Sequence, residues 1–180
     1  AAEEEVAIRK QVGEFLLQNG RYVEAEAEAE KLLASAPQDS PEEAAGLRVR
    51  ALALVRQYQT GALAREASGS VKILEPLAVA HKKNLDDLVL ADLLARAYLD
   101  DKLVLSEIPD KNKDARIKLA SDCLDELVKA RSNDPQAYMV RFLYRTDRSR
   151  ADSTPNSPGA KQALEQALKL GPKNVTVLIT

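Results

Sequence analysis

The chain has 180 residues, of which 30% are charged, and its formal net charge is −2 at pH 7. This balance provides no excess of basic side chains to neutralise phosphates, so general nucleic-acid binding is disfavoured. No apolar run approaches the ~20 residues that a helix needs to cross a bilayer, so we expect no membrane insertion. Only 4% of the residues are aromatic, whereas 28 are alanine and 26 are leucine. Because alanine and leucine favour helices, we expect an all-α fold.

The first two predicted helices occupy residues 4–19 and 22–36. Asn19-Gly20 separates them, because glycine tolerates the left-handed backbone geometry that closes a helix. The second helix contains an alternating run of glutamate and alanine, and both residues form helices well and strands poorly. One face of this helix is predicted to carry residues spaced three and four apart: Ala25, Ala29, Leu32 and Leu33. One side of the first helix is predicted to carry Val6, Ile8, Val12, Phe15 and Leu16.

A third helix is predicted over 41–59, because Ser40-Pro41 supplies a capping serine and a proline at the first helical position. A fourth helix is expected within 62–84. Pro76 lies inside this segment, where proline removes a backbone donor and clashes with the preceding turn. We therefore predict either a kink or a late start after Ser70.

The second half of the chain predicts further helices and two insertions. The helices are expected at 86–99, at 114–131, from about 136 to 146 and at 160–170, with the start of a ninth at 175–180. The insertion at 100–113 carries apolar residues, which we expect either to cover the helices or to contact a partner. The insertion at 147–159 is polar and is predicted to be a mobile loop.

The segment 12–37 places small, large and aromatic residues at spacings that define a known repeat. These residues are Gly13, Leu16, Gly20, Tyr22, Ala25, Leu33 and Pro37. The chain thereby resembles the tetratricopeptide repeat (TPR) family, in which each repeat of about 34 residues is a helix, a turn and a second helix. The resemblance covers about four repeats, at 6–39, 41–85, 86–135 and 136–173. It departs from the family at Arg9 and Arg141, where large apolar residues are usual, and in the greater length of repeats two to four.

The resemblance implies a right-handed superhelical stack of antiparallel helix pairs, with about eight helices and the start of a ninth, forming a single domain over 1–180. We expect the chain to be a segment of a larger protein. The family's activity is binding without catalysis or cofactors, so the implied partner is a protein or a peptide. The family's concave groove maps onto Lys10, Glu14, Leu17, Arg50, Leu54, Gln57, Asp92, Arg96, Leu99, Met139 and Leu143.

One subgroup of the family binds a C-terminal carboxylate through a lysine and an asparagine in the first repeat. Here Lys10 is present, but Glu14 replaces the asparagine and would repel a carboxylate. We therefore exclude binding of a chaperone tail.

Catalytic and metal-binding functions find little support in the residue types. The chain contains one histidine, His81, and one cysteine, Cys123, and no cluster with metal-ligand spacing. His81 is expected to interact with a helix dipole, and Cys123 to pack on a helix face. The acidic pairs at 86–87 and 100–101 are interpreted as helix caps or solvated charges.

Two alternatives to groove binding remain after the sequence is considered. Exposed repeat ends could stack against another chain, which would make the chain an assembly or spacer element. The one basic and aromatic cluster could bind RNA: Tyr138, Arg141, Phe142, Tyr144, Arg145, Arg148 and Arg150. A single cysteine and the lack of a signal-peptide pattern are compatible with the cytoplasm, and a targeting signal can lie outside the segment.

Overall fold

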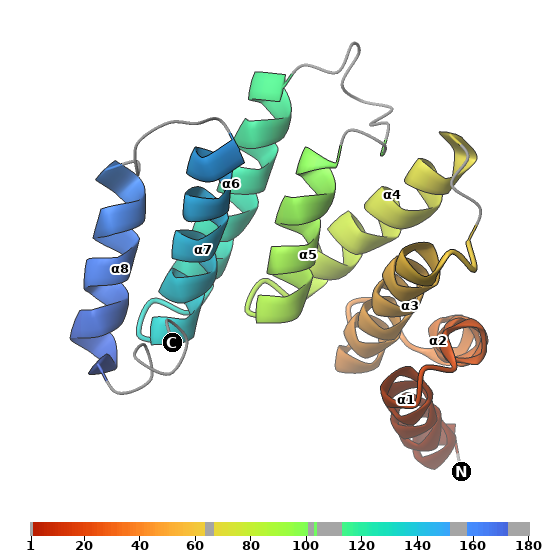
Figure 1. The fold of residues 1–180 in the computed structure, drawn as a ribbon. Coiled ribbons are helices and arrows are strands. Elements are labelled where there is room, and N and C mark those ends of the chain that lie inside the picture. Colours follow the sequence, from red (N-terminus) through yellow and green to blue (C-terminus); the bar gives the residue numbers. More distant parts are fainter. Residues whose placement is uncertain (1, 64–66, 101–102, 104–112, 152–157, 173–180) are drawn as a thin grey trace. The chain divides into compact units, whose positions relative to one another are not determined.

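The computed structural model describes residues 2–63, 67–100, 103, 113–151 and 158–172. These residues form eight helices and no strand, which confirms the predicted all-α fold (Figure 1). The helices are α1 (Ala2–Gln18), α2 (Tyr22–Ser35), α3 (Pro41–Thr60), α4 (Ala67–Lys83), α5 (Leu88–Leu99), α6 (Lys113–Ala130), α7 (Pro135–Ala151) and α8 (Pro158–Leu170). The predicted start of a ninth helix at 175–180 lies outside the described residues.

The chain divides into two compact units, the first containing α1–α4 and the second containing α5–α8. Most residues of the 100–113 insertion lie outside the described residues, but Leu103 is described, and it belongs to the first unit. Leu103 is 3% exposed. For this residue, burial agrees with the expectation that the insertion covers helices.

In the first unit, α2 contacts α1 and α3, α1 contacts α3, and α3 contacts α4. Two glycines allow the helices to approach closely. A methyl group at Gly13 would lie 3.1 Å from Val49 Cγ1, and one at Gly46 would lie 3.0 Å from Leu33 Cδ2. The core between α1, α2 and α3 is made of small and aliphatic residues: Leu16, Ala25, Ala29, Val49 and Ala53. Helix α3 therefore packs against both helices of the first pair.

The ends of α3 follow local sequence signals. The Ser40 side chain accepts a hydrogen bond from Glu43 N at 3.0 Å, which confirms the predicted cap. Gly61 ends α3 with a φ of 77°, in the left-handed region that glycine adopts without strain. These two residues fix where the chain enters and leaves the helix.

Helix α4 begins at Ala67 and continues through Pro76, so the predicted late start after Ser70 is wrong. Proline inside a helix costs about 3 kcal/mol. Ile73 and Leu77, on either side of the proline, are each at most 2% exposed. Burial of an aliphatic side chain stabilises by about 1.5–3 kcal/mol, so two such residues offset the cost of the proline.

In the second unit, α6 contacts α5 and α7, α5 contacts α7, and α7 contacts α8. Asp87 caps α5, because its Oδ1 accepts hydrogen bonds from Val89 N at 2.8 Å and Leu90 N at 3.0 Å. This bonding confirms the interpretation of that aspartate as a cap. Helix α7 extends to Ala151 and α8 begins at Pro158, so both ends of the predicted 147–159 loop are helical.

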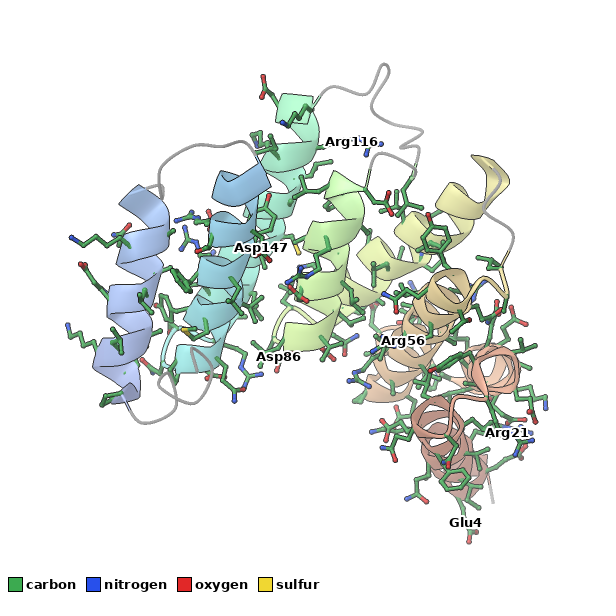
Figure 2. All side chains as sticks on the ribbon, in the orientation of Figure 1. Glu4, Arg21, Arg56, Asp86, Arg116 and Asp147 are labelled. Carbon is green, nitrogen blue, oxygen red and sulfur yellow. The ribbon has the colours of Figure 1, made fainter. Side chains whose placement is uncertain are left out.

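Arg116 is a buried charged residue near the start of α6, and it is only 4% exposed. Its Nη1 donates a hydrogen bond to Asp100 O at 2.8 Å and another to Tyr98 O at 3.4 Å. These carbonyls lie at the C-terminal end of α5, where backbone acceptors have no partner within the helix. Figure 2 shows Arg116 on α6 beside this end of α5. The guanidinium therefore joins the two helices.

Candidate protein-binding surface

The eleven residues predicted to line a groove differ widely in exposure. Three are exposed: Lys10, Arg96 and Leu143. Five are partly buried: Glu14, Leu17, Arg50, Asp92 and Leu99. The remaining three, Leu54, Gln57 and Met139, are each at most 5% exposed. Because buried side chains offer almost no area to a partner, we remove these last three from the predicted surface.

Two of the buried residues have structural roles inside their units. The Gln57 side-chain amide donates a hydrogen bond to Glu26 Oε2 at 2.6 Å and a longer one to Tyr22 O at 3.4 Å, which joins α3 to α2. Met139 forms a buried cluster with Ala167 of α8. Both side chains therefore stabilise contacts between helices.

The groove residues of α3 lie apart from those of α1. A cleft of about 510 Å³ has a described lining from α2, α3, α4 and the segment after α3: Glu26, Leu47, Arg50, Leu54, Leu63, Glu75, Pro76 and Val79. Arg50 Nη2 lies 3.7 Å from Glu30 Oε1 of α2. No described residue of this lining comes from α1, so Arg50 and Leu54 do not share the cleft with Lys10.

The second unit brings predicted groove residues of α5 and α7 together. Arg96 Nε donates hydrogen bonds to Asp92 Oδ1 at 2.9 Å and to Asp92 Oδ2 at 3.0 Å, within α5. Arg96 Nη1 also lies 3.5 Å from Asp147 Oδ2, and Asp147 is on α7 (Figure 2). Leu143, one helical turn before Asp147, is 39% exposed. We call the set of Asp92, Arg96, Leu143 and Asp147 the α5–α7 surface.

The electrostatics of the α5–α7 surface combine one cation with two carboxylates. The side chains of Arg96 and Asp147 are about half exposed, at 51% and 52%, and that of Asp92 is 32% exposed. Ion pairs with this exposure contribute at most about 1 kcal/mol to stability, so they can rearrange when a charged partner approaches. Asp147 was not among the predicted surface residues, because the polar sequence from this position onwards predicted a loop, whereas α7 continues past it.

The chain matches no protein-family model, no curated protein and no solved structure.

Two findings bear on other classes of function. Among the residues that the structure describes, no helix is both long and apolar enough to span a membrane. Within the same part of the chain, no three side chains of histidine, cysteine, aspartate or glutamate gather as metal ligands.

The predicted basic and aromatic cluster on α7 is engaged in packing. Tyr138 and Phe142 pack against the cluster that joins α7 to α8, and Tyr144 is 4% exposed. Arg141 Nη2 pairs with Asp125 Oδ1 of α6 at 2.7 Å. The side chains at positions 148 and 150 lie outside the described residues. A nucleic-acid base needs an exposed aromatic face for stacking, so this arrangement does not favour RNA binding.

The two candidate catalytic side chains are buried. His81, in the last turn of α4, is 3% exposed, and Cys123, on α6, is 4% exposed. The Cys123 thiol lies 3.5 Å from Ala91 O of α5. Burial raises the pKa of this thiol to about 12, with smaller contributions from the carboxylates of Glu126 and Asp92. The packing role predicted for Cys123 agrees with this environment.

We expect the Cys123 thiol to react slowly with Ellman's reagent at pH 8 in the folded chain. A pKa raised from 9.0 to about 12 lowers the fraction of thiolate, which is the reactive form, by about a thousandfold. Absorbance at 412 nm would follow the reaction with and without 8 M urea, which exposes the thiol. Equal rates in the two solutions would contradict the burial of Cys123.

The same raised pKa has a consequence for stability at high pH. The stabilisation from keeping this thiol protonated is fully present below pH 9 and is lost as the pH rises towards 12, because the unfolded thiol ionises first. A Cys123→Ala variant should lack this part of the alkaline loss.

Proposed function

We propose that the chain is a protein-interaction module of the tetratricopeptide-repeat type, which binds a peptide or a partner helix across the α5–α7 surface and performs no catalysis. The observation that carries the proposal is the exposed Leu143 one helical turn from Asp147, whose carboxylate pairs with Arg96. An apolar side chain that a partner can bury, next to charges that fix the partner's orientation, is the usual composition of a protein interface.

The pattern of helix contacts supports the repeat type. In the first unit, α1 contacts its partner α2 and also α3, the first helix of the next pair, and α2 contacts α3 as well. In the second unit, α5 contacts α6 and α7 in the same way, and α6 contacts α7. Small residues at the contacts, such as Gly13 and Gly46, allow close packing of successive pairs. A stack of helix pairs built in this way leaves one face of its first helices available to a ligand.

The charges of the α5–α7 surface define the chemistry of the proposed partner. Arg96 pairs with two carboxylates, those of Asp92 and Asp147, so the surface has one carboxylate more than it has cations. A lysine or arginine of the partner can pair with Asp147 or Asp92, while an apolar side chain covers Leu143. We therefore propose an amphipathic segment that carries an apolar residue close to a basic one.

A double variant, Asp147→Lys with Leu143→Ser, is expected to bind the partner at least ~10-fold more weakly than the native chain, which corresponds to a loss of about 1.4 kcal/mol. The variant removes the apolar contact and replaces a carboxylate that pairs with the basic residue of the partner by a cation that repels it. Affinity capture from the lysate of the source cell would compare the two baits. Fluorescence anisotropy with a peptide from the captured protein would then give both dissociation constants.

A matched control carries the same changes of residue type at other exposed positions, Asp122→Lys and Val23→Ser. Neither position belongs to the α5–α7 surface, so this variant should capture the same protein as the native chain. Identical capture by all three baits would contradict binding at the α5–α7 surface, and so would equal loss in the two variants.

A further inference from the structure

The cleft of about 510 Å³ in the first unit shares no residue with the α5–α7 surface. Helix α3 forms its floor, because α2 and α4 both pack against α3 (Figure 1). The floor is largely apolar: Leu54 is 4% exposed, and Leu47 is partly buried. Val79 of α4 adds another apolar side chain. We call this site the α3 cleft, and its volume is in the range of sites that bind small molecules.

One wall of the α3 cleft is set by the way in which α4 packs on α3. At the end of α4, Lys83 Nζ donates a hydrogen bond to Glu43 Oε2, near the start of α3, at 3.1 Å. The two helices therefore run antiparallel. Val79 and Glu75, one and two turns before Lys83, consequently lie along the middle of α3, where both line the cleft.

The opposite wall carries a second glutamate, Glu26 of α2. The amide of Gln57, which is 5% exposed, donates to Glu26 Oε2 at 2.6 Å and thereby fixes the carboxylate beside α3. Within the described part of the chain, neither Glu26 nor Glu75 forms an ion pair. Arg50 also lines the cleft, but its Nη2 lies 3.7 Å from Glu30 Oε1, which balances its charge. Each wall therefore carries a carboxylate without a compensating cation.

Pro76 also lines the α3 cleft, and it leaves a backbone acceptor on α4. Proline has no N–H, so the carbonyl of Lys72, one turn earlier on the same face of the helix, lacks its usual helical donor. A ligand that reaches this carbonyl must supply a hydrogen-bond donor. The walls of the cleft thus combine two carboxylates and a backbone carbonyl, all of them acceptors, around an apolar floor.

We propose that the α3 cleft binds an aliphatic polyamine, that is, a hydrocarbon chain that carries two or more ammonium groups. Its ammonium groups pair with Glu26 and Glu75 on the two walls, and the hydrocarbon between them covers the apolar floor. An ammonium group has three donors and no acceptor, which matches the acceptors of the walls. A single lysine side chain of a protein partner would leave one of the two carboxylates unpaired, so a ligand with two charges fits the cleft better.

Titration of the isotope-labelled 180-residue chain with cadaverine, a five-carbon diamine, tests the proposal by nuclear magnetic resonance. The backbone amide signals of Leu47, Leu54, Leu63 and Val79 should shift along one binding curve, and the signals of the second unit should stay in place. Pentylamine, which has the same carbon chain and one ammonium group, should bind at least ~5-fold more weakly. Pentanediol, which is uncharged, should cause no shift. Added salt should weaken the binding of cadaverine.

Two variants test the carboxylates separately. Glu26→Gln keeps a side-chain oxygen that can accept the hydrogen bond of Gln57, and Glu75→Gln changes an exposed position, so both should fold like the native chain. Each should bind cadaverine at least ~5-fold more weakly, because one ammonium group loses its partner. Glu24→Gln is the matched control, since Glu24 is exposed on α2 and is not part of the described lining of the cleft. This control should bind cadaverine like the native chain.

Four results would overturn the proposal. The first is a native chain whose signals do not shift with cadaverine at concentrations up to tens of millimolar. The second is pentylamine binding as tightly as cadaverine, which would indicate a site for one cation, such as a lysine of a protein partner. The third is unchanged binding in Glu26→Gln and Glu75→Gln, and the fourth is an equal loss in Glu24→Gln, which would indicate unspecific attraction to the acidic helix. Circular dichroism confirms that each variant is folded.

Discussion

Replacing Arg116 with methionine is expected to lower the free energy of unfolding by about 2–4 kcal/mol. Methionine keeps most of the side-chain length. The loss of stability therefore measures the missing hydrogen bonds more than a cavity left by a shorter side chain. The carbonyls of Asp100 and Tyr98 would lose a charged donor inside the protein, where water does not replace it readily. Urea denaturation followed by circular dichroism at 222 nm would measure the change.

Lys118→Met is the matched control on the same helix. The Lys118 side chain is 78% exposed, and its ion pair with Asp122 lies on the surface, so we expect no measurable change in stability. Arg116→Lys keeps the charge but offers a single ammonium group, and its stability should lie between those of the native chain and Arg116→Met. A methionine variant as stable as the native chain would contradict a structural role for the Arg116 hydrogen bonds.

The sequence predicted the features that depend on neighbouring residues. The capping serine at Ser40 and the capping aspartate at Asp87 each bond to backbone within three residues, so their role is visible in a short segment. The turn glycines Gly20 and Gly61 adopt positive φ values for the same local reason. These signals were sufficient to place eight helices and the all-α fold.

Features that depend on contacts between helices were not predictable in the same way. Arg116 bonds to backbone 16 and 18 residues earlier in the chain, across the 100–113 insertion. Gln57 was assigned to a groove from the resemblance to tetratricopeptide repeats, yet its amide bonds to α2 inside the first unit. Asp147 joins the α5–α7 surface only because α7 runs further than the polar composition of its end indicates. In each case a distant segment decides the environment.

Truncating a core leucine is expected to destabilise the unit that contains it by about 2–5 kcal/mol. Leu32 in the first unit is 1% exposed and Leu127 in the second is completely buried. Leu32→Ala and Leu127→Ala each remove three carbons from a packed interior and leave a cavity lined by the neighbouring helices. Urea denaturation would give the size of each loss, and hydrogen exchange read by mass spectrometry would give its location.

The location distinguishes two ways in which the chain can unfold. Compact units with separate cores should open separately, so Leu32→Ala should speed exchange mainly in α1–α4 and Leu127→Ala mainly in α5–α8. Val23→Ala, at a residue that is 63% exposed, controls for the loss of apolar side-chain atoms from the surface and should change neither. Equal acceleration in both units by either core variant would mean that the chain unfolds as one cooperative block, because separate opening confines the effect of a cavity to the unit that contains it.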